Sequence, residues 1–233
     1  MNVVVVACLV LVRKGCDKQW LFQVSTGRSG STTLKAILND LPGVYIAGEN
    51  DGMVSSLLEL RKKSDRTGYI KRNVSAWSHK EIDKEALNKV LKLYVQTAIG
   101  AKADVCYTVL GFKEIRFTVE ELNFLKELFP FAKFIVNIRK DTRKQLQSQM
   151  QYLKKGRKPT LDSVNERNAA LSNWANKNSK IVFRLPLEDF SEINFHALFK
   201  WLNFTRCLLI HLPHQNHDGY ELENRTNFVR CAD

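Results

Sequence analysis

The stretch WLFQVSTGRSGSTTLKAIL, residues 20–38, decides the fold of this 233-residue chain. An apolar run leads into a glycine-rich turn and then an amphipathic segment, which predicts a strand at 20–25, a loop, and a helix at 32–41. Backbone N–H groups at such a helix start bind phosphate. The alternative is a plain Ser/Thr cap after a glycine turn, although a cap that faces phosphate fulfils both roles.

The loop differs from the Walker A loop of nucleotide triphosphatases, G-x-x-x-x-G-K-[ST]. Gly27 and Gly30 lie only three residues apart, no lysine follows, and Arg28 stands early in the loop. In a Walker A loop the lysine neutralises the β- and γ-phosphates, and the Ser/Thr hydroxyl that follows it binds magnesium. The residues therefore predict a phosphate-binding loop that does not hydrolyse ATP.

Strands and helices alternate along the rest of the chain. Further strands are predicted at 43–47, 105–112, 133–138 and 180–185. Helices are predicted at 52–63, 141–155, 160–177 and 191–202. Capping boxes open two more helices, at Ser78–Glu81 and Thr118–Glu121, the first with an apolar face of Ile82, Ala86, Val90, Tyr94 and Ala98. Continuous apolar strands separated by helices predict one α/β domain of three layers, α/β/α, with a central parallel sheet.

GRSGSTTL, residues 27–34, resembles the 5′-phosphosulfate loop of sulfotransferases that use 3′-phosphoadenosine-5′-phosphosulfate (PAPS). It is most similar to the Golgi-type branch, which includes tyrosylprotein and carbohydrate sulfotransferases. Two further blocks are similar to that family: GFKEIRFTVEELNFLKELFPFAKFI, 111–135, and KFIVNIRKDTRKQLQS, 133–148. The resemblance implies a P-loop-like sulfotransferase fold for a domain at 20–233, with residues 1–19 as a separate apolar segment.

The resemblance also implies which residues hold the donor. The 5′-phosphosulfate would be bound by the loop residues Gly27, Arg28, Ser29, Gly30, Ser31, Thr32 and Thr33. Arg139 and Ser148 would hold the 3′-phosphate, but their spacing of nine (148 − 139) is one more than the family leads us to expect. Lys140 or Arg143 could therefore take over either role. Otherwise Arg139 is a solvated arginine paired with Asp141, and Ser148 a helix residue facing water.

Sulfuryl transfer to a hydroxyl needs cations at the sulfuryl oxygens and a base for the acceptor proton. Arg28 and Lys113 are the candidate cations, because both follow predicted parallel strands where open α/β sheets bind ligands. Glu49 is the candidate base: it lies 21 residues after Arg28, the distance found in the tyrosylprotein branch. The alternatives are a surface role for Glu49 and a pairing of Lys113 with Glu114 or another acid. No metal is expected, because the transferred group carries less charge than a phosphoryl group.

The C-terminal third departs from the family pattern. LPLEDF, 185–190, stands where many relatives have a tyrosine followed by an acid, and Asn216 and Gly219 are candidates for a loop that closes over the cofactor. His211, His214 and His217 are spaced three apart, which does not match the helical spacing of H-E-x-x-H zinc sites. Trp174 is expected to be a core contact of its helix.

The N-terminus and the cysteines bear on the compartment. VVVVACLVLV, 3–12, is too short to span a bilayer, which takes roughly 20 residues. Three interpretations of this run are open: the apolar core of a signal peptide, a first buried strand, or a truncated start. The first would allow membrane association. Three sequons, at Asn73, Asn203 and Asn224, favour a Golgi or secretory lumen over the cytoplasm. Cys207 and Cys231 would pair in an oxidising compartment, and Cys106 is expected to be a buried small residue.

The net charge of +12 favours an anionic partner. A PAPS-dependent sulfotransferase acting on a carbohydrate hydroxyl is the expected function, and transfer to tyrosine in an acidic peptide is the alternative. The basic run at 139–158 leaves open a non-catalytic nucleotide- or nucleic-acid-binding module. Tyr152 alone does not make an aromatic interleaving of this run, and no groove-reading motif accompanies it, so no nucleic acid is expected.

Overall fold

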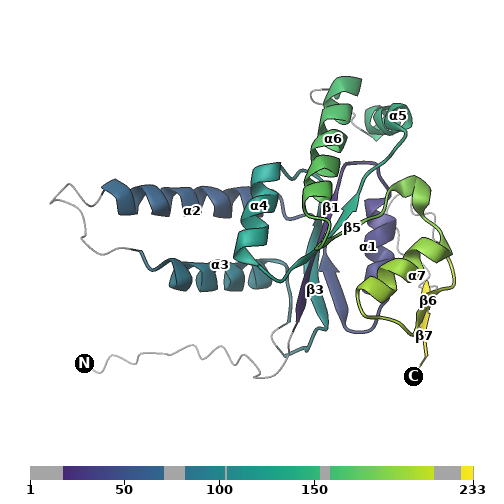
Figure 1. Ribbon diagram of the computed structural model, residues 1–233, viewed down its shortest axis with the longest axis horizontal. Coiled ribbons are helices and arrows are strands. Elements are labelled where there is room, and N and C mark those ends of the chain that lie inside the picture. The colour runs from purple at the N-terminus through teal and green to yellow at the C-terminus, as the bar shows by residue number, and fades with distance from the viewer. Residues whose placement is uncertain (1–17, 71–81, 103, 153–157, 213–226, 233) are drawn as a thin grey trace.

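The chain folds around a five-stranded sheet of order β2-β3-β1-β4-β5, near the centre of Figure 1. The computed structural model describes residues 18–70, 82–102, 104–152, 158–212 and 227–232. All neighbouring strands of this sheet are parallel. The strands are β1 Gln19–Ser25, β2 Val44–Ala47, β3 Val109–Glu114, β4 Lys133–Asn137 and β5 Val182–Arg184.

Helices cover both faces of the sheet, so the predicted three-layer α/β/α fold is confirmed. One face packs against α2, α3, α4 and α6, and the other against α1, α7 and an antiparallel pair of short strands, β6 and β7. Figure 1 shows α2 and α3 extending away from the sheet. These elements are α1 Ser31–Asn39, α2 Met53–Ile70, α3 Lys84–Ala98, α4 Val119–Leu128, α5 Thr142–Tyr152, α6 Leu161–Lys177, α7 Glu192–Trp201, β6 Cys207–Leu209 and β7 Val229–Cys231. None of the helices in the described part of the chain is long and apolar enough to cross a membrane.

Aromatic side chains fill the core between the sheet and the helices of the first face. Phe22, Phe112 and Phe134 come from three adjacent strands and are fully buried. The ring centroid of Phe22 lies 5.0 Å from that of Phe112 and 5.3 Å from that of Phe134. Trp174 on α6 packs 5.1 Å from Phe134 and donates its indole N–H to Asn123 Oδ1. The expectation that Trp174 is a core contact is confirmed.

The third strand differs from its prediction. The strand expected at 105–112 begins at Val109 and continues through Lys113 to Glu114. Cys106 lies ahead of it in an exposed segment and is disulfide-bonded. The prediction of Cys106 as a buried small residue is therefore wrong, because Cys106 precedes the buried strand expected to contain it.

Helix α3 begins later than its predicted capping box. It starts at Lys84, and the carboxylate of Asp83 accepts hydrogen bonds from the N–H groups of Glu85 and Ala86. The box at 78–81 lies outside the described residues. The cap of the helix is Asp83, whose backbone is extended as an N-cap requires.

The apolar face predicted for α3 is also wrong. Val90 and Tyr94 are 61% and 54% exposed, whereas Leu91 and Val95 are buried against the sheet layer. The helix carries two apolar stripes one residue apart, and both have the four-residue spacing of a helix face. Only packing against the rest of the fold selects between them.

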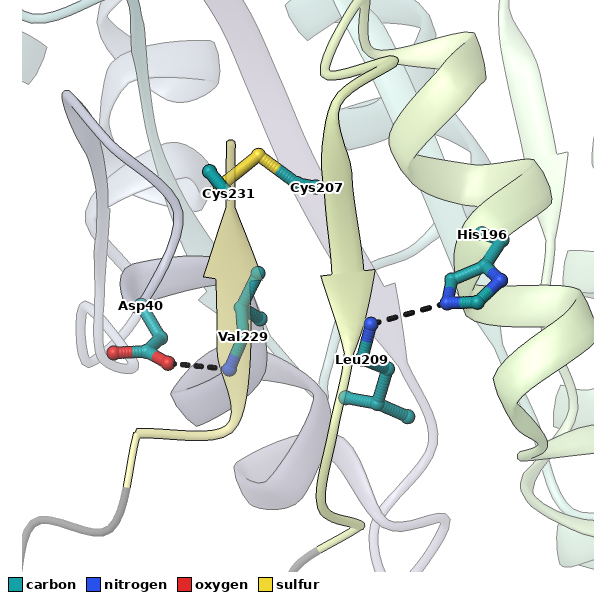
Figure 2. Close-up of a disulfide and its surroundings, with 6 residues drawn as sticks. All are labelled: Asp40, His196, Cys207, Leu209, Val229 and Cys231. Carbon is teal, nitrogen blue, oxygen red and sulfur yellow. Dashed lines mark hydrogen bonds between the residues drawn. A yellow bond between two sulfur atoms is a disulfide. The ribbon is translucent and has the colours of Figure 1, made fainter. Parts of the chain in front are cut away.

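The C-terminal strand pair is tied to α1 and α7, as Figure 2 shows. A disulfide joins Cys207 to Cys231, which confirms the predicted pairing. Asp40, after the end of α1, accepts the N–H of Val229 at 2.7 Å, and His196 Nε2 accepts the N–H of Leu209 at 3.1 Å. The last strand is thus anchored to the helix that starts at the glycine-rich loop.

Removal of the disulfide between Cys207 and Cys231 is expected to lower the free energy of unfolding. The double variant Cys207→Ser, Cys231→Ser should unfold at lower denaturant, with a free energy of unfolding lower by about 3 kcal/mol, because the bond closes a 24-residue separation. Equilibrium denaturation followed by circular dichroism measures this, with the disulfide of Cys106 left intact in both proteins. An unchanged midpoint would contradict the prediction.

Candidate active site

The glycine-rich loop after β1 turns sharply into α1. Arg28 and Gly30 both have left-handed backbone conformations, with φ of 65° and 76°. An added Cβ at Gly30 would lie 2.6 Å from Leu187 Cδ1, so the turn needs glycine there. Among the described residues, no side chain caps the N-terminus of α1. Its first N–H groups are thus free of side-chain partners, as an anion site at a helix start requires.

The hydroxyl-bearing residues of the loop differ in how far they are buried. Ser29 is fully buried, and its hydroxyl donates to the carbonyl of Thr26 at 2.6 Å. Ser31 and Thr33 are buried in the first turn of α1, and Thr32 is half-buried. Of the predicted cofactor-binding residues, Ser29 can therefore offer its backbone but not a free hydroxyl.

Asn137, at the end of β4, holds the loop in place. Its Nδ2 donates to the carbonyls of Ser29 at 2.9 Å and Leu185 at 3.0 Å. Its Oδ1 accepts the hydroxyls of Ser25 at 3.2 Å and Ser29 at 3.0 Å. Asn137 is fully buried, so this one amide fixes the loop relative to β1, β4 and the segment after β5.

Two glutamines of α5 hold the other side of the loop. Gln145 Nε2 donates to Thr26 Oγ1 at 2.9 Å and to the carbonyl of Gly27 at 2.8 Å. Gln149 Nε2 donates to the same carbonyl at 3.1 Å. Gln145 is itself held by Asn168 on α6, which donates to its Oε1 at 2.9 Å. The backbone of the loop is therefore positioned before any ligand binds.

The structure brings Arg28 and Ser148 together. Arg28 Nε donates to Ser148 Oγ at 2.9 Å, and the guanidinium lies 5.2 Å from the ring centroid of Tyr152. Ser148 and Tyr152 are both on α5. Arg28, predicted to bind the 5′-phosphosulfate, therefore contacts the helix of Ser148, which is predicted to bind the 3′-phosphate. This contact contradicts the alternative in which Ser148 only faces water.

Arg139 has a buried donor without a partner. Its Nε is buried and makes no hydrogen bond to the described residues, while its carbonyl accepts Asn168 Nδ2 at 2.9 Å. Asp141, the partner considered for Arg139, instead accepts the N–H of Lys144 at 2.9 Å. A buried guanidinium N–H left unsatisfied is costly, and an anionic ligand would satisfy it. The donor set at Arg139 therefore fits a phosphate.

The two substitutes considered for Arg139 have other surroundings. Lys140 Nζ pairs with Asp189 at 2.6 Å. Arg143 lies with Leu146 and Met150 along an apolar groove of α5. Neither neighbour has the partnerless buried donor that Arg139 has, and the role of Arg139 stays a prediction.

The divergent segment LPLEDF, 185–190, contacts both the backbone after Arg139 and the glycine-rich loop. The Glu188 carboxylate accepts the N–H groups of Lys140 at 2.8 Å and Asp141 at 3.0 Å, directly after Arg139. Burial acts to raise the pKa of Glu188, but these backbone hydrogen bonds outweigh it, so the pKa lies below its ordinary value. Leu187, next to Glu188, packs over Gly30, where an added Cβ would lie 2.6 Å from Leu187 Cδ1.

The predicted base and the predicted strand-end cation are in direct contact. Lys113 Nζ lies 2.8 Å from Glu49 Oε1, and Arg116 lies 3.6 Å from Glu49 Oε2. The side chain of Lys113 is 9% exposed and that of Glu49 is 32% exposed. Glu114, the other acid considered for Lys113, accepts the N–H groups of Asn50 and Ile115 instead. Each carboxylate oxygen of Glu49 thus has its own cation.

The remaining sequence candidates lie mostly outside the described residues. Asn216, Gly219, His214 and His217 fall there, and His211 stacks on Phe228 with a centroid distance of 6.3 Å. Within the ranges that the structure describes, no three His, Cys, Asp or Glu side chains form a group that could bind a metal.

Sequence reasoning missed three residues of the site: Asn137, Gln145 and Lys35. Asn137 carried a signal, because it is the one polar residue within the apolar run FIVNI. Gln145 and Lys35 gave none, since a glutamine or lysine on an amphipathic helix is ordinary. Lys35 is half-buried on α1, and its pKa is lowered first by burial and then by the nearby charge of Lys113.

Comparison with known proteins identifies this fold. The model of the sulfotransferase family matches residues 21–202. Among solved structures, the sulfotransferase domain of an olefin synthase from Synechococcus PCC 7002 superimposes with a TM-score of 0.53 at 15% identity, covering 82% of this chain and 76% of that one. A sulfotransferase domain from the curacin biosynthetic pathway has a TM-score of 0.49 at 16% identity, covering 80% and 74%. No curated protein sequence matches the chain.

Removal of the Asn137 amide is expected to loosen the loop. Asn137→Ala should lower the free energy of unfolding by about 3 kcal/mol, because two hydroxyls and two carbonyls lose a buried partner. Asn123→Ala, which loses one bond to Trp174, is the matched control and should cost about 1 kcal/mol. Denaturant unfolding of both variants compares them. Equal losses would show that Asn137 is not a special support.

Proposed function

The chain belongs to the sulfotransferase family, and we propose that it transfers a sulfuryl group from PAPS to a hydroxyl acceptor. Within the family we propose the Golgi-type branch, to which the loop GRSGSTTL is most similar. The single observation that carries the proposal is the Glu49–Lys113 contact of 2.8 Å at the C-terminal edge of the sheet, beside an uncapped helix start. A candidate base, a candidate cation and a helix start suited to an anion thus lie at one edge of the sheet, which supports the proposal.

The donor would be held at two points. The N–H groups at the start of α1, with Arg28 and Thr32, would bind the 5′-phosphosulfate. Arg139, whose Nε lacks a partner among the described residues, would bind the 3′-phosphate together with Ser148. Both points lie on backbone that Asn137, Gln145 and Glu188 already hold, so little ordering is needed on binding.

The transfer step would be an in-line displacement at sulfur. The acceptor oxygen forms a bond to sulfur while the bond from sulfur to the 5′-phosphate oxygen breaks, and 3′,5′-adenosine bisphosphate (PAP) leaves. Glu49 would take the proton of the acceptor hydroxyl. Lys113 and Arg28 would stabilise the charge that develops on the bridging and sulfuryl oxygens.

A carbohydrate hydroxyl is the acceptor that we propose. The net charge of +12 suits an anionic glycan, and Arg116 adds an exposed cation beside Glu49. Tyrosine in an acidic peptide is the second candidate, favoured by the pairing of Glu49 with Lys113, since both residues match the tyrosylprotein branch. Assay of glycans and acidic peptides with labelled PAPS separates the two.

An oxidising secretory compartment is part of the proposal. The disulfide between Cys207 and Cys231 supports it, because such bonds persist mainly outside the cytosol. The sequon at Asn203 supports it too, because this asparagine is exposed in a left-handed turn after α7. Detection of a glycan at Asn203 in protein from secretory cells would test this part.

The donor proposal predicts magnesium-independent binding of PAP. Titration by calorimetry should give micromolar affinity without magnesium, and Arg139→Gln should weaken it at least tenfold, because the 3′-phosphate loses a charged hydrogen-bond donor. Arg184→Gln is the matched control, since Arg184 is exposed and bonds Asn176. Failure of the wild-type protein to bind PAP, or a preference for magnesium-ATP, would overturn the sulfotransferase proposal.

The base assignment predicts a loss of turnover without a loss of donor binding. Glu49→Gln should reduce kcat by about 100-fold or more, since the amide cannot accept the acceptor proton. Its PAP affinity should stay at the wild-type value. Glu85→Gln, at the far end of α3, is the matched control and should keep full activity. A Glu49→Gln enzyme of normal kcat would remove Glu49 from the mechanism.

A further inference from the structure

Lys35 on α1 lies close enough to Lys113 for the two charges to interact, although it belongs neither to the glycine-rich loop nor to a strand. Asn39 on α1 holds both backbone groups of Ile46 on β2: its Nδ2 donates to the carbonyl at 2.9 Å, and its Oδ1 accepts the N–H at 2.6 Å. Lys35 is one helical turn nearer the start of α1, on the same side. Because α1 and β2 run in opposite directions, that turn lies beside the end of β2, where Glu49 follows.

The ammonium of Lys35 reaches back toward the start of α1. Side chains of a helix tilt toward its N-terminus, and a lysine stem spans about one turn of helix. Lys113, on the neighbouring strand end, lies close enough that its charge acts on Lys35. The two ammonium groups therefore lie in the same region, at the edge of the sheet where α1 begins.

No acid in the described part of the chain neutralises Lys35. The carboxylate that pairs with Lys113 is Glu49, and its two oxygens are taken by Lys113 and Arg116. Lys35 itself forms no ion pair with a described residue and is half-buried. A partly desolvated positive charge next to a second one is unfavourable until an anion binds between them.

A buried glutamine borders the same space. Gln23 on β1 is the register partner of Lys113 on β3 and is fully buried. Its Nε2 donates to the carbonyl of Ser31 at 2.7 Å, on the first turn of α1. Its Oε1 has no partner among the described residues, so it is free to accept an N–H from a lysine.

We propose that Lys35 is a second cation of the transfer centre, which with Lys113 binds the oxygens of the sulfuryl group. This rests on the proposed function. The N–H groups at the start of α1 would bind the 5′-phosphate, whereas Lys35 lies on the side of that helix that carries Asn39 and contacts β2. In an in-line displacement the transferred group lies between the leaving oxygen and the base-bound acceptor, which is where the two lysines meet.

The test compares PAPS with PAP, which lacks the sulfuryl group. Lys35→Gln should weaken PAPS binding about tenfold and leave PAP binding unchanged, because only PAPS carries the oxygens that Lys35 contacts. The same variant should lower kcat, and Lys35→Arg should restore part of both. Lys177→Gln, an exposed lysine at the end of α6, is the matched control. Competition calorimetry at short times measures the affinities, and thermal unfolding checks that each variant folds.

Three results would overturn the inference. Equal weakening of PAPS and PAP would assign Lys35 to the 5′-phosphate, and no change in either would assign it to the acceptor or to structure alone. If the wild-type protein binds neither nucleotide, the proposed function fails as a whole. That last failure appears in the wild-type titration and is thus distinct from the failures seen only in the variant.

Discussion

The structure of the site depends on one buried amide, Asn137. A loop that offers backbone N–H groups to an anion cannot use them to stabilise itself, so its shape must come from elsewhere. Asn137 provides this by binding the carbonyl and the hydroxyl of Ser29 and the carbonyl of Leu185. One residue of β4 thereby joins three segments that are distant in the sequence.

This arrangement explains why the site is rigid at one end and open at the other. Gln145 and Gln149 fix Gly27, and Glu188 fixes the backbone after Arg139, all through main-chain atoms. Among the described residues, Arg139 Nε has no hydrogen-bond partner and Lys35 has no ion pair. The buried side chains hydrogen-bond the backbone of the site, and its cationic groups remain available to a ligand. This is the pattern of a preorganised anion site.

The sequence predicted the parts of this site that are local. Apolar runs marked the strands, and the glycine spacing marked the loop, because both depend on neighbouring residues alone. The stripe of α3 that packs inward, and the burial of Asn137, depend on contacts between segments far apart in the chain. Likewise, the sequence could not predict that Lys35 lies near Lys113, because this depends on how α1 packs on β2 through Asn39 and Ile46.

The charges around Glu49 are balanced only when a donor is counted. Lys113 and Arg116 lie on its two oxygens, and Lys35 adds a positive charge that acts on Lys113. One carboxylate therefore serves a region with three cations, in a partly buried space where charges interact more strongly than in water. An anionic donor would draw Lys113 and Lys35 toward itself and leave Glu49 with fewer partners. Lys113 would then turn from Glu49 to the sulfuryl oxygens, which PAP lacks, so Glu49 would be held by this lysine in the free protein and released toward the acceptor hydroxyl only when the full donor is bound.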